Sequence, residues 1–211
     1  MARSAPDALL LIAPGCTHCP SVLQELSALV KEGKLGRLEV VNIVEHPEVA
    51  QQVGTRSVPW TRIGPFELEG NQSQGELERW TGHAANDTGV ADYFSHLLET
   101  QRPHRVTEMV HAEPQQLDSL LALLESEELP MAARIGIGVV MEELQGEPIL
   151  LHSLPTLLRL SESQHASLRA DAAHYLGLCG TNAARPRLQE LLDDEHPDVR
   201  EIAADSLQEI D

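Results

Sequence analysis

The pattern of apolar residues changes once along this 211-residue chain, close to residue 85. Before that point, short apolar runs alternate with amphipathic stretches, as in proteins that alternate strands and helices. After residue 87 the apolar residues keep the spacing of helices, three and four positions apart. The change predicts two domains of different class, an α/β domain followed by an all-α domain.

The first 82 residues predict the element order β-α-β-(α)-β-β-α. The first two strands need a crossover helix between them, so we expect them to pair in parallel, whereas a Gly-Pro turn at 64–65 joins the last two as a hairpin. Strands are expected at residues 8–13, 38–44, 57–63 and 66–69, and helices at 19–31, 47–53 and 75–80.

Two cysteines, Cys16 and Cys19, lie where the first predicted strand gives way to the first predicted helix. The exposed N–H groups and the partial positive charge of a helix N-terminus favour a thiolate there. A thiolate attacks disulfides and a thiol does not, so this position favours redox chemistry. Such motifs lower the pKa of a cysteine from about 8.5 to roughly 3.5–7.5. His18 adds a positive charge if it is protonated; alternatively it is a solvated turn residue with no effect on the pKa.

Three segments of the second part align with one another: residues 133–138, 168–173 and 199–204. In each, an apolar residue precedes an arginine and small residues follow it at helical spacing. A leucine-rich helix lies before each segment, and an acidic or polar turn separates the two. The arginines recur after 35 and 31 residues, and a repeated pair of helices at this period predicts an α-solenoid.

These repeats resemble HEAT repeats of the short type found in phycobilin-lyase-like proteins. Residues 196–207 match that pattern best, and the first repeat departs most, with Gly136 and Gly138 at its small positions. The resemblance covers about residues 114–211, or about three repeats. It implies an extended surface that binds another protein.

Residues 8–82 resemble the thioredoxin-like superfamily in strand order, in the cysteine pair and in the Val58-Pro59 dipeptide. They are most similar to glutaredoxin-like half-domains with Cys-x-x-Cys-Pro and a Val-Pro loop. The resemblance implies that Cys16 is the attacking thiolate and Cys19 the resolving thiol. It also implies that Pro59 is a cis-proline facing them, in a loop whose free backbone edge binds a substrate strand.

The sequence departs from thioredoxin itself beside this motif. Gly15 replaces the aromatic residue that precedes the cysteines, and Leu10 takes the place of a buried acid on the preceding strand. No proton acceptor for Cys19 is therefore evident. Trp60, directly after Pro59, is expected either to cover the sulfurs in part or to be a core aromatic residue.

The expected fold is thus an α/β thioredoxin-like domain at residues 1–85 and an all-α HEAT-like solenoid at 114–211, joined by a connecting helix and linker at 86–113. The formal net charge is −18, of which −15 lies in residues 86–211. Such an acidic unit excludes nucleic acid and anionic membrane as good partners and favours a basic protein. Alternatively, the acidity only keeps a helical surface soluble.

No apolar run approaches the roughly 18 residues of a membrane helix, and the run near the start is too short for a signal peptide. Three cysteines are too few for a disulfide-stapled secreted fold. We therefore expect a cytoplasmic protein. Cys179, on an apolar helix end, is expected to be a buried small hydrophobe, or else a third thiol that exchanges with Cys16.

Three functions agree with these patterns. The first is a thiol–disulfide oxidoreductase acting on a protein that the acidic repeats bind. The second is a non-enzymatic interaction scaffold with a redox-sensing or structural dithiol. The third is a metal-binding protein using Cys16 and Cys19, which would need two remote ligands that the sequence does not indicate. We expect no cofactor and no metal for the first two.

Overall fold

The structure, a computed structural model, describes residues 5–210 of the chain. It consists of two compact units, one ending at Gly89 and the other beginning at Val90. The first unit contains every strand of the described residues, and the second is built of helices. Each unit is described by itself below.

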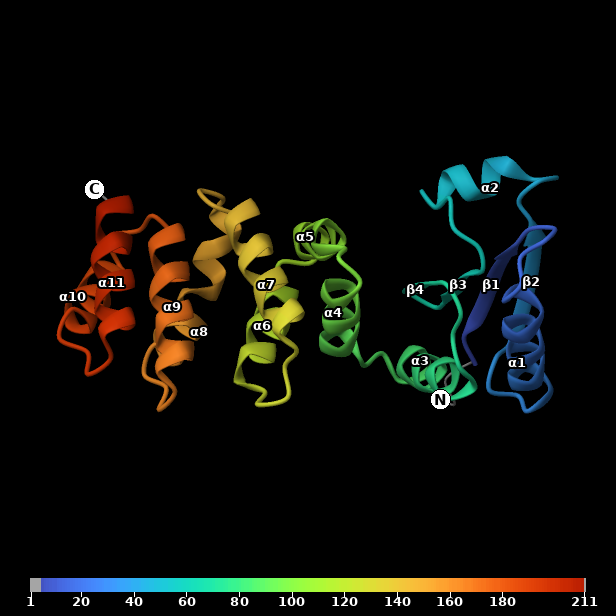
Figure 1. Ribbon diagram of the computed structural model, residues 1–211, viewed down its shortest axis with the longest axis horizontal. Helices are drawn as coiled ribbons and strands as arrows, with labels where there is room; N and C mark the ends of the chain where they lie inside the picture. Colours follow the sequence, from blue (N-terminus) through green and yellow to red (C-terminus); the bar gives the residue numbers. More distant parts are fainter. Residues whose placement is uncertain (1–4, 211) are drawn as a thin grey trace. The chain divides into compact units, whose positions relative to one another are not determined.

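A four-stranded sheet forms the centre of the first unit, with strand order β2-β1-β3-β4 (Figure 1). β1 and β2 pair in parallel, and β3 is antiparallel to both β1 and β4, as the predicted crossover and hairpin require. The strands are β1 (Asp7–Ile12), β2 (Arg37–Asn42), β3 (Trp60–Ile63) and β4 (Phe66–Glu69), and the helices of this unit are α1 (Cys19–Lys31), α2 (Pro47–Gln52) and α3 (Gln74–Asn86).

The two faces of the sheet bury different sets of side chains, because successive strand residues point to opposite sides. On one face Leu9 and Leu11 pack against Ala50 of α2 and against Trp60. Leu10, between them in the sequence, is fully buried and points to the other side. Both faces of β1 are thus covered, which explains why its sequence is a continuous apolar run rather than an alternating one.

Two element boundaries differ from those that the sequence predicts. β3 begins at Trp60 rather than at residue 57, because Pro59 has no N–H for the ladder and the N–H of Ser57 is bonded to the Thr55 hydroxyl in a turn. α3 continues past Gly82 to Asn86, after a capping box at its start in which Ser73 and Glu76 bond each other's backbone N–H groups.

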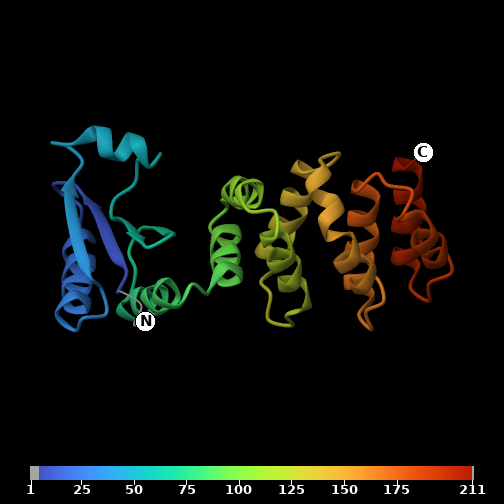
Figure 2. The ribbon, with the colours of Figure 1, turned by 180° about the vertical axis from the view of Figure 1, so that it is seen from behind.

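The second unit consists of helices in successive pairs, which follow one another along the unit when it is seen from behind (Figure 2). The predicted repeats correspond to α6 with α7, α8 with α9, and α10 with α11. The bounds are α4 (Val90–Glu99), α5 (Pro103–Ala112), α6 (Gln116–Ala122), α7 (Met131–Glu143), α8 (Leu154–Leu160), α9 (Ala166–Leu178), α10 (Arg185–Leu191) and α11 (Pro197–Glu209), with 3₁₀ turns η1 (Leu123–Glu125) and η2 (Pro148–Ser153).

The sequence predicts a connecting helix and a linker at 86–113, and the structure differs there. α4 and α5 are both regular helices that pack on α6 and α7 within the second unit. The break expected at Arg102-Pro103 is a helix start, because Pro103 occupies the first turn of α5, where a proline costs no hydrogen bond.

The repeated arginines have a shared structural role in two of the three repeats. Arg169 and Arg200 each donate to the two backbone carbonyls that lie six and five residues before them, at 2.7–3.2 Å. Each therefore closes the turn between the two helices of its repeat. Arg134 of the first repeat instead forms a 2.6 Å ion pair with Asp171 on α9, which agrees with its weaker match to the repeat pattern.

Small residues let the second helices of neighbouring repeats approach closely. A Cβ atom on Gly177 would lie 2.7 Å from the Cβ of Ser206 on α11, and a Cβ on Gly138 would meet nothing nearer than the Tyr175 hydroxyl at 3.7 Å. We expect Gly177→Ala to lower the free energy of unfolding by about 1–3 kcal/mol through overpacking. Gly138→Ala should raise it by about 0.5–1 kcal/mol through helix propensity. Urea denaturation measures both, and changes of equal sign would contradict the expectation.

Candidate functional site

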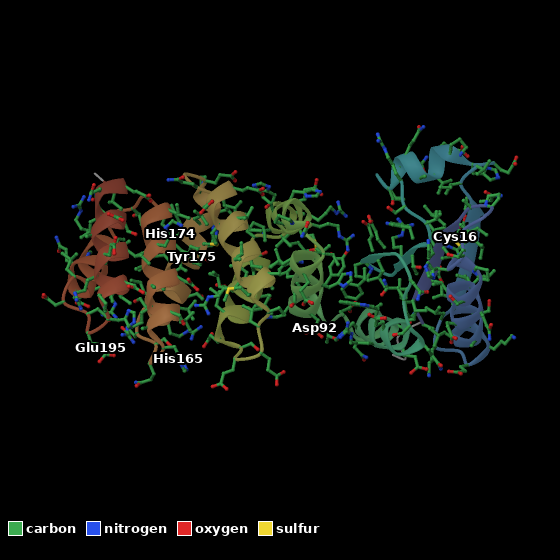
Figure 3. The ribbon with its side chains drawn as sticks, in the orientation of Figure 1. Cys16, Asp92, His165, His174, Tyr175 and Glu195 are labelled. Carbon is green, nitrogen blue, oxygen red and sulfur yellow. A yellow bond between two sulfur atoms is a disulfide. The ribbon has the colours of Figure 1, made fainter. Side chains whose placement is uncertain are left out.

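The two cysteines lie at the start of α1, immediately after the chain leaves β1 (Figure 3). Gly15 has φ +80°, a backbone conformation that glycine adopts without strain, and it turns the chain toward the helix. The N–H of Cys16 donates to the carbonyl of Ala13 at 3.3 Å and closes this turn. The sequence thus places the first cysteine before the helix and the second at its first residue.

Cys16 and Cys19 form a disulfide with a Cα–Cα distance of 5.5 Å. Cys19 is buried with 5% of its surface exposed, whereas Cys16 is half-buried. The backbone N–H of Cys19 donates to the Sγ of Cys16 at 3.1 Å. The more accessible sulfur is therefore the one that receives a hydrogen bond from the first amide of the helix.

His18 is exposed at the N-cap position of α1 and forms no side-chain capping bond. Its carbonyl accepts hydrogen bonds from the N–H of Val22 and from the hydroxyl of Ser21. The contacts of His18 thus belong to its backbone, and a role of its imidazole in tuning Cys16 stays a prediction.

The sheet register brings the cysteine loop and the Val58-Pro59 loop to one end of the sheet. Leu11 pairs with Trp60 in antiparallel register, so the chain leaving β1 and the chain entering β3 emerge at the same edge. The Val58–Pro59 peptide bond is cis, and the Pro59 carbonyl accepts from the N–H of Gly70 at 2.9 Å. Within residues 5–210, neither the N–H nor the carbonyl of Val58 forms a backbone hydrogen bond.

Trp60 has 1% of its surface exposed and packs with Leu9, Leu11 and Ala50. This is the environment of a core aromatic residue, one of the two roles expected for it. Val58 is half-buried and packs against the same cluster, while Pro59 is buried. The loop that carries Val58 is therefore anchored through its apolar side chains, which leaves its backbone polar groups to face outward.

A buried hydroxyl lies next to the position where thioredoxin has its acid. Thr61 pairs with Leu10 across the sheet, is fully buried, and its Oγ1 has no hydrogen-bond partner among the described residues. The sequence analysis does not single out this residue. The signal was a lone threonine in an otherwise apolar strand, but its meaning depends on the register, which the sequence alone does not determine.

Cys179 lies in the second unit with 9% of its surface exposed, and its Sγ is 3.7 Å from the Leu150 carbonyl. Burial raises the pKa of this thiol to about 11. It is therefore protonated near neutral pH and packs as a small apolar residue, as the sequence suggests.

Among the residues that the structure describes, no three His, Cys, Asp or Glu side chains are grouped so that they could hold a metal ion. Cys16 and Cys19 thus have no further candidate ligand beside them in residues 5–210. In the same part of the chain, no helix is both long and apolar enough to cross a membrane.

Comparison with known families agrees with this geometry. A family model described as a thioredoxin domain matches residues 8–82, and one described as HEAT repeats matches residues 153–211. The chain therefore joins a thioredoxin-like domain to C-terminal HEAT repeats, as predicted. The HEAT match covers α8 to α11, the two repeats with the clearest pattern. No curated protein sequence matches the chain.

Proposed function

We propose that the thioredoxin-like unit is a thiol–disulfide oxidoreductase that acts on a protein partner, and that the HEAT repeats bind this partner. The observation that carries the proposal is the 3.1 Å hydrogen bond from the Cys19 N–H to the Sγ of Cys16. After reduction, this amide and the helix N-terminus stabilise negative charge on Cys16 and so lower its pKa.

The exchange proceeds in two steps that balance in atoms and electrons. In the reducing direction the Cys16 thiolate attacks one sulfur of a substrate disulfide, a mixed disulfide forms, and the second substrate sulfur leaves as a thiolate. The Cys19 thiolate then attacks the Sγ of Cys16, releases the first substrate sulfur and leaves the Cys16–Cys19 disulfide. Two electrons pass to the substrate, and the reverse sequence oxidises a substrate dithiol.

The free backbone of Val58 supports a protein substrate rather than a small thiol. An extended substrate segment can donate to the Val58 carbonyl and accept from its N–H, in the manner of strand addition. An open depression of about 590 Å³ adjoins this loop and gives room for such a segment. It is lined by Ile43, Pro47, Ala50, Gln51, Gly54, Thr55 and Arg56.

The second step requires Cys19 to lose its proton, and here the site differs from thioredoxin. Leu10 offers no proton acceptor, and the burial of Cys19 disfavours its charged form. This observation favours the alternative function, a scaffold whose dithiol has a structural or sensing role. A cytoplasmic location, where such thiols are kept reduced, also belongs to the proposal.

A covalent trap separates the two functions. Cys19→Ser in a Cys179→Ser background leaves Cys16 as the single thiol, and after incubation with insulin we expect a mixed disulfide on Cys16 that mass spectrometry identifies. The matched control is Cys16→Ser in the same background, where Cys19 should form little adduct because it is buried. Equal adduct in both variants, or none in either, would remove the oxidoreductase function and leave the scaffold.

A further inference from the structure

Three large apolar side chains are exposed along one face of α7. Met131, Ile135 and Val139 follow one another four residues apart and have 69%, 62% and 36% of their surfaces exposed. We call these three residues the α7 stripe. Side chains four positions apart lie on the same helix face, so the stripe is continuous over two turns. Exposed apolar residues scattered singly are common, but a contiguous row of them marks an interaction site.

The opposite face of α7 is already occupied, because Gly136 lies against Leu98 of α4 and its apolar neighbours are fully buried. The stripe is thus surplus to the packing of this unit. The buried positions of α7 are Ala133, Gly136, Ile137, Val140 and Met141.

The equivalent face changes in character from one repeat to the next. When the three repeated arginines are aligned, the position after each arginine is first apolar, then small, then acidic. The position five residues after each arginine changes from apolar to histidine to acidic, and Figure 3 labels the histidine on α9. The two series are Ile135, Ala170 and Glu201, and Val139, His174 and Asp205.

The charges on this face are not balanced internally. Among the described residues, Glu201 and Asp205 on α11 form no ion pair, and neither do Glu127 and Glu128 in the turn before α7. By contrast, the nearby arginines are already engaged, Arg134 with Asp171, Arg159 with Glu125 and Arg169 with Asp194. The surface therefore presents an apolar row at one repeat and unpaired carboxylates beside it and two repeats further on.

We propose that the α7 stripe and the carboxylates of α11 form a docking surface for a basic amphipathic helix of the partner protein. This inference rests on the proposed function in that the HEAT-like unit binds the partner, and it names the chemistry of that partner. Apolar side chains at helical spacing pack on the stripe, and lysines or arginines face Glu201 and Asp205. An acidic partner is excluded by repulsion, since charge complementarity decides between partners of equal hydrophobicity.

The test uses a defined probe and the oxidised full-length protein, so that its outcome is independent of thiol exchange. The probe is a fluorescent 18-residue helical peptide of leucine and lysine with one apolar face, and its matched control replaces every lysine by glutamate. Fluorescence anisotropy should give a dissociation constant at least tenfold lower for the lysine peptide. The double variant Met131→Ser/Ile135→Ser should weaken binding about tenfold or more.

Two matched variants make the result decisive. Leu151→Ser removes an apolar side chain that is 47% exposed on η2 and should leave binding unchanged. Glu201→Lys should weaken binding several-fold, whereas Glu39→Lys, the same charge change on an exposed residue of β2, should not. Circular dichroism confirms that each variant is folded.

Three outcomes would overturn the inference. Equal losses in the test and control variants would mean that only net charge attracts the peptide. An unchanged dissociation constant in the stripe variant would place the peptide elsewhere. A dimer in sedimentation that the Met131→Ser/Ile135→Ser variant dissolves would show that a second copy of the chain covers the stripe. Each of these leaves the insulin trap on Cys16 unaffected, so failure here and failure of the oxidoreductase function are distinguishable.

Discussion

Replacing Cys16 by serine should lower the rate of disulfide exchange by on the order of a thousandfold or more, because a serine hydroxyl is not ionised near neutral pH and cannot replace the nucleophile. The reduction of insulin in the presence of dithiothreitol measures this rate. Cys19→Ser should also lose turnover, but for a different reason, since its Cys16 can still attack and then stays in the mixed disulfide. Cys179→Ser should have the rate of the unchanged protein.

The pH dependence of the reaction with iodoacetamide tests the cause of this effect. Because the Cys19 N–H stabilises the thiolate, the alkylation of Cys16 in the reduced protein should have its midpoint below the usual value of about 8.5. Cys179 should react only after unfolding, since burial raises its pKa to about 11. A Cys16 midpoint at or above 8.5, or equal rates in wild type and Cys16→Ser, would contradict the proposed role of the helix start.

The largest expected effect on stability is that of Arg169→Leu. Arg169 forms two 2.8 Å hydrogen bonds to the carboxylate of Asp194, and both side chains are only 8% exposed. It also donates to two backbone carbonyls of the turn before α9. Removing one partner of such a pair leaves the other buried and unpaired, so we expect a loss of about 3 kcal/mol in the free energy of unfolding. Urea denaturation followed by circular dichroism measures it.

Arg159→Leu is the matched control, because Arg159 pairs with Glu125 in the same bidentate manner but both side chains are about half exposed. Its loss should be below about 1 kcal/mol. Equal losses would mean that burial does not decide the strength of these pairs.

Acid should reduce the difference between wild type and Arg169→Leu. The hydrogen bonds from Arg169 hold the pKa of Asp194 below its usual value of 3.8. A carboxyl whose pKa is lowered in the folded state stabilises the protein above its unfolded pKa, and this contribution is lost as the pH falls through the folded value. The destabilisation by Arg169→Leu should therefore be complete at pH 6 and decrease below about pH 4.

The sequence was sufficient for the strand order, the helix after the cysteines and the repeat boundaries, because each depends on local periodicity or on a turn residue. β1 is continuous and apolar since both of its faces are buried, and α1 shows the spacing of a helix with one buried face. These local patterns agree with the tertiary structure, and they also identified the loop of Val58 and Pro59 as the one that reaches the cysteine end of the sheet.

What the sequence could not show depends on long-range packing. α5 was missed because Pro103 predicts a break, and only the packing of this helix on α7 shows that the proline begins it. The burial of Trp60 follows from its position opposite Leu11, and the unpartnered hydroxyl of Thr61 from its position opposite Leu10. Both pairings join residues about 50 positions apart in the chain.

The arginines that bond the carbonyls of the within-repeat turns also decide where this protein can change in length. Leu160 precedes Arg169 by nine residues, and Leu191 precedes Arg200 by nine. The repeat periods nevertheless differ by four residues, and the difference lies in the connections between repeats: 20 residues separate Arg134 from the start of α8, and 16 separate Arg169 from the start of α10. Insertions are therefore tolerated in the connection that contains η2, and an insertion of even one residue before Arg169 would pull the guanidinium away from both carbonyls.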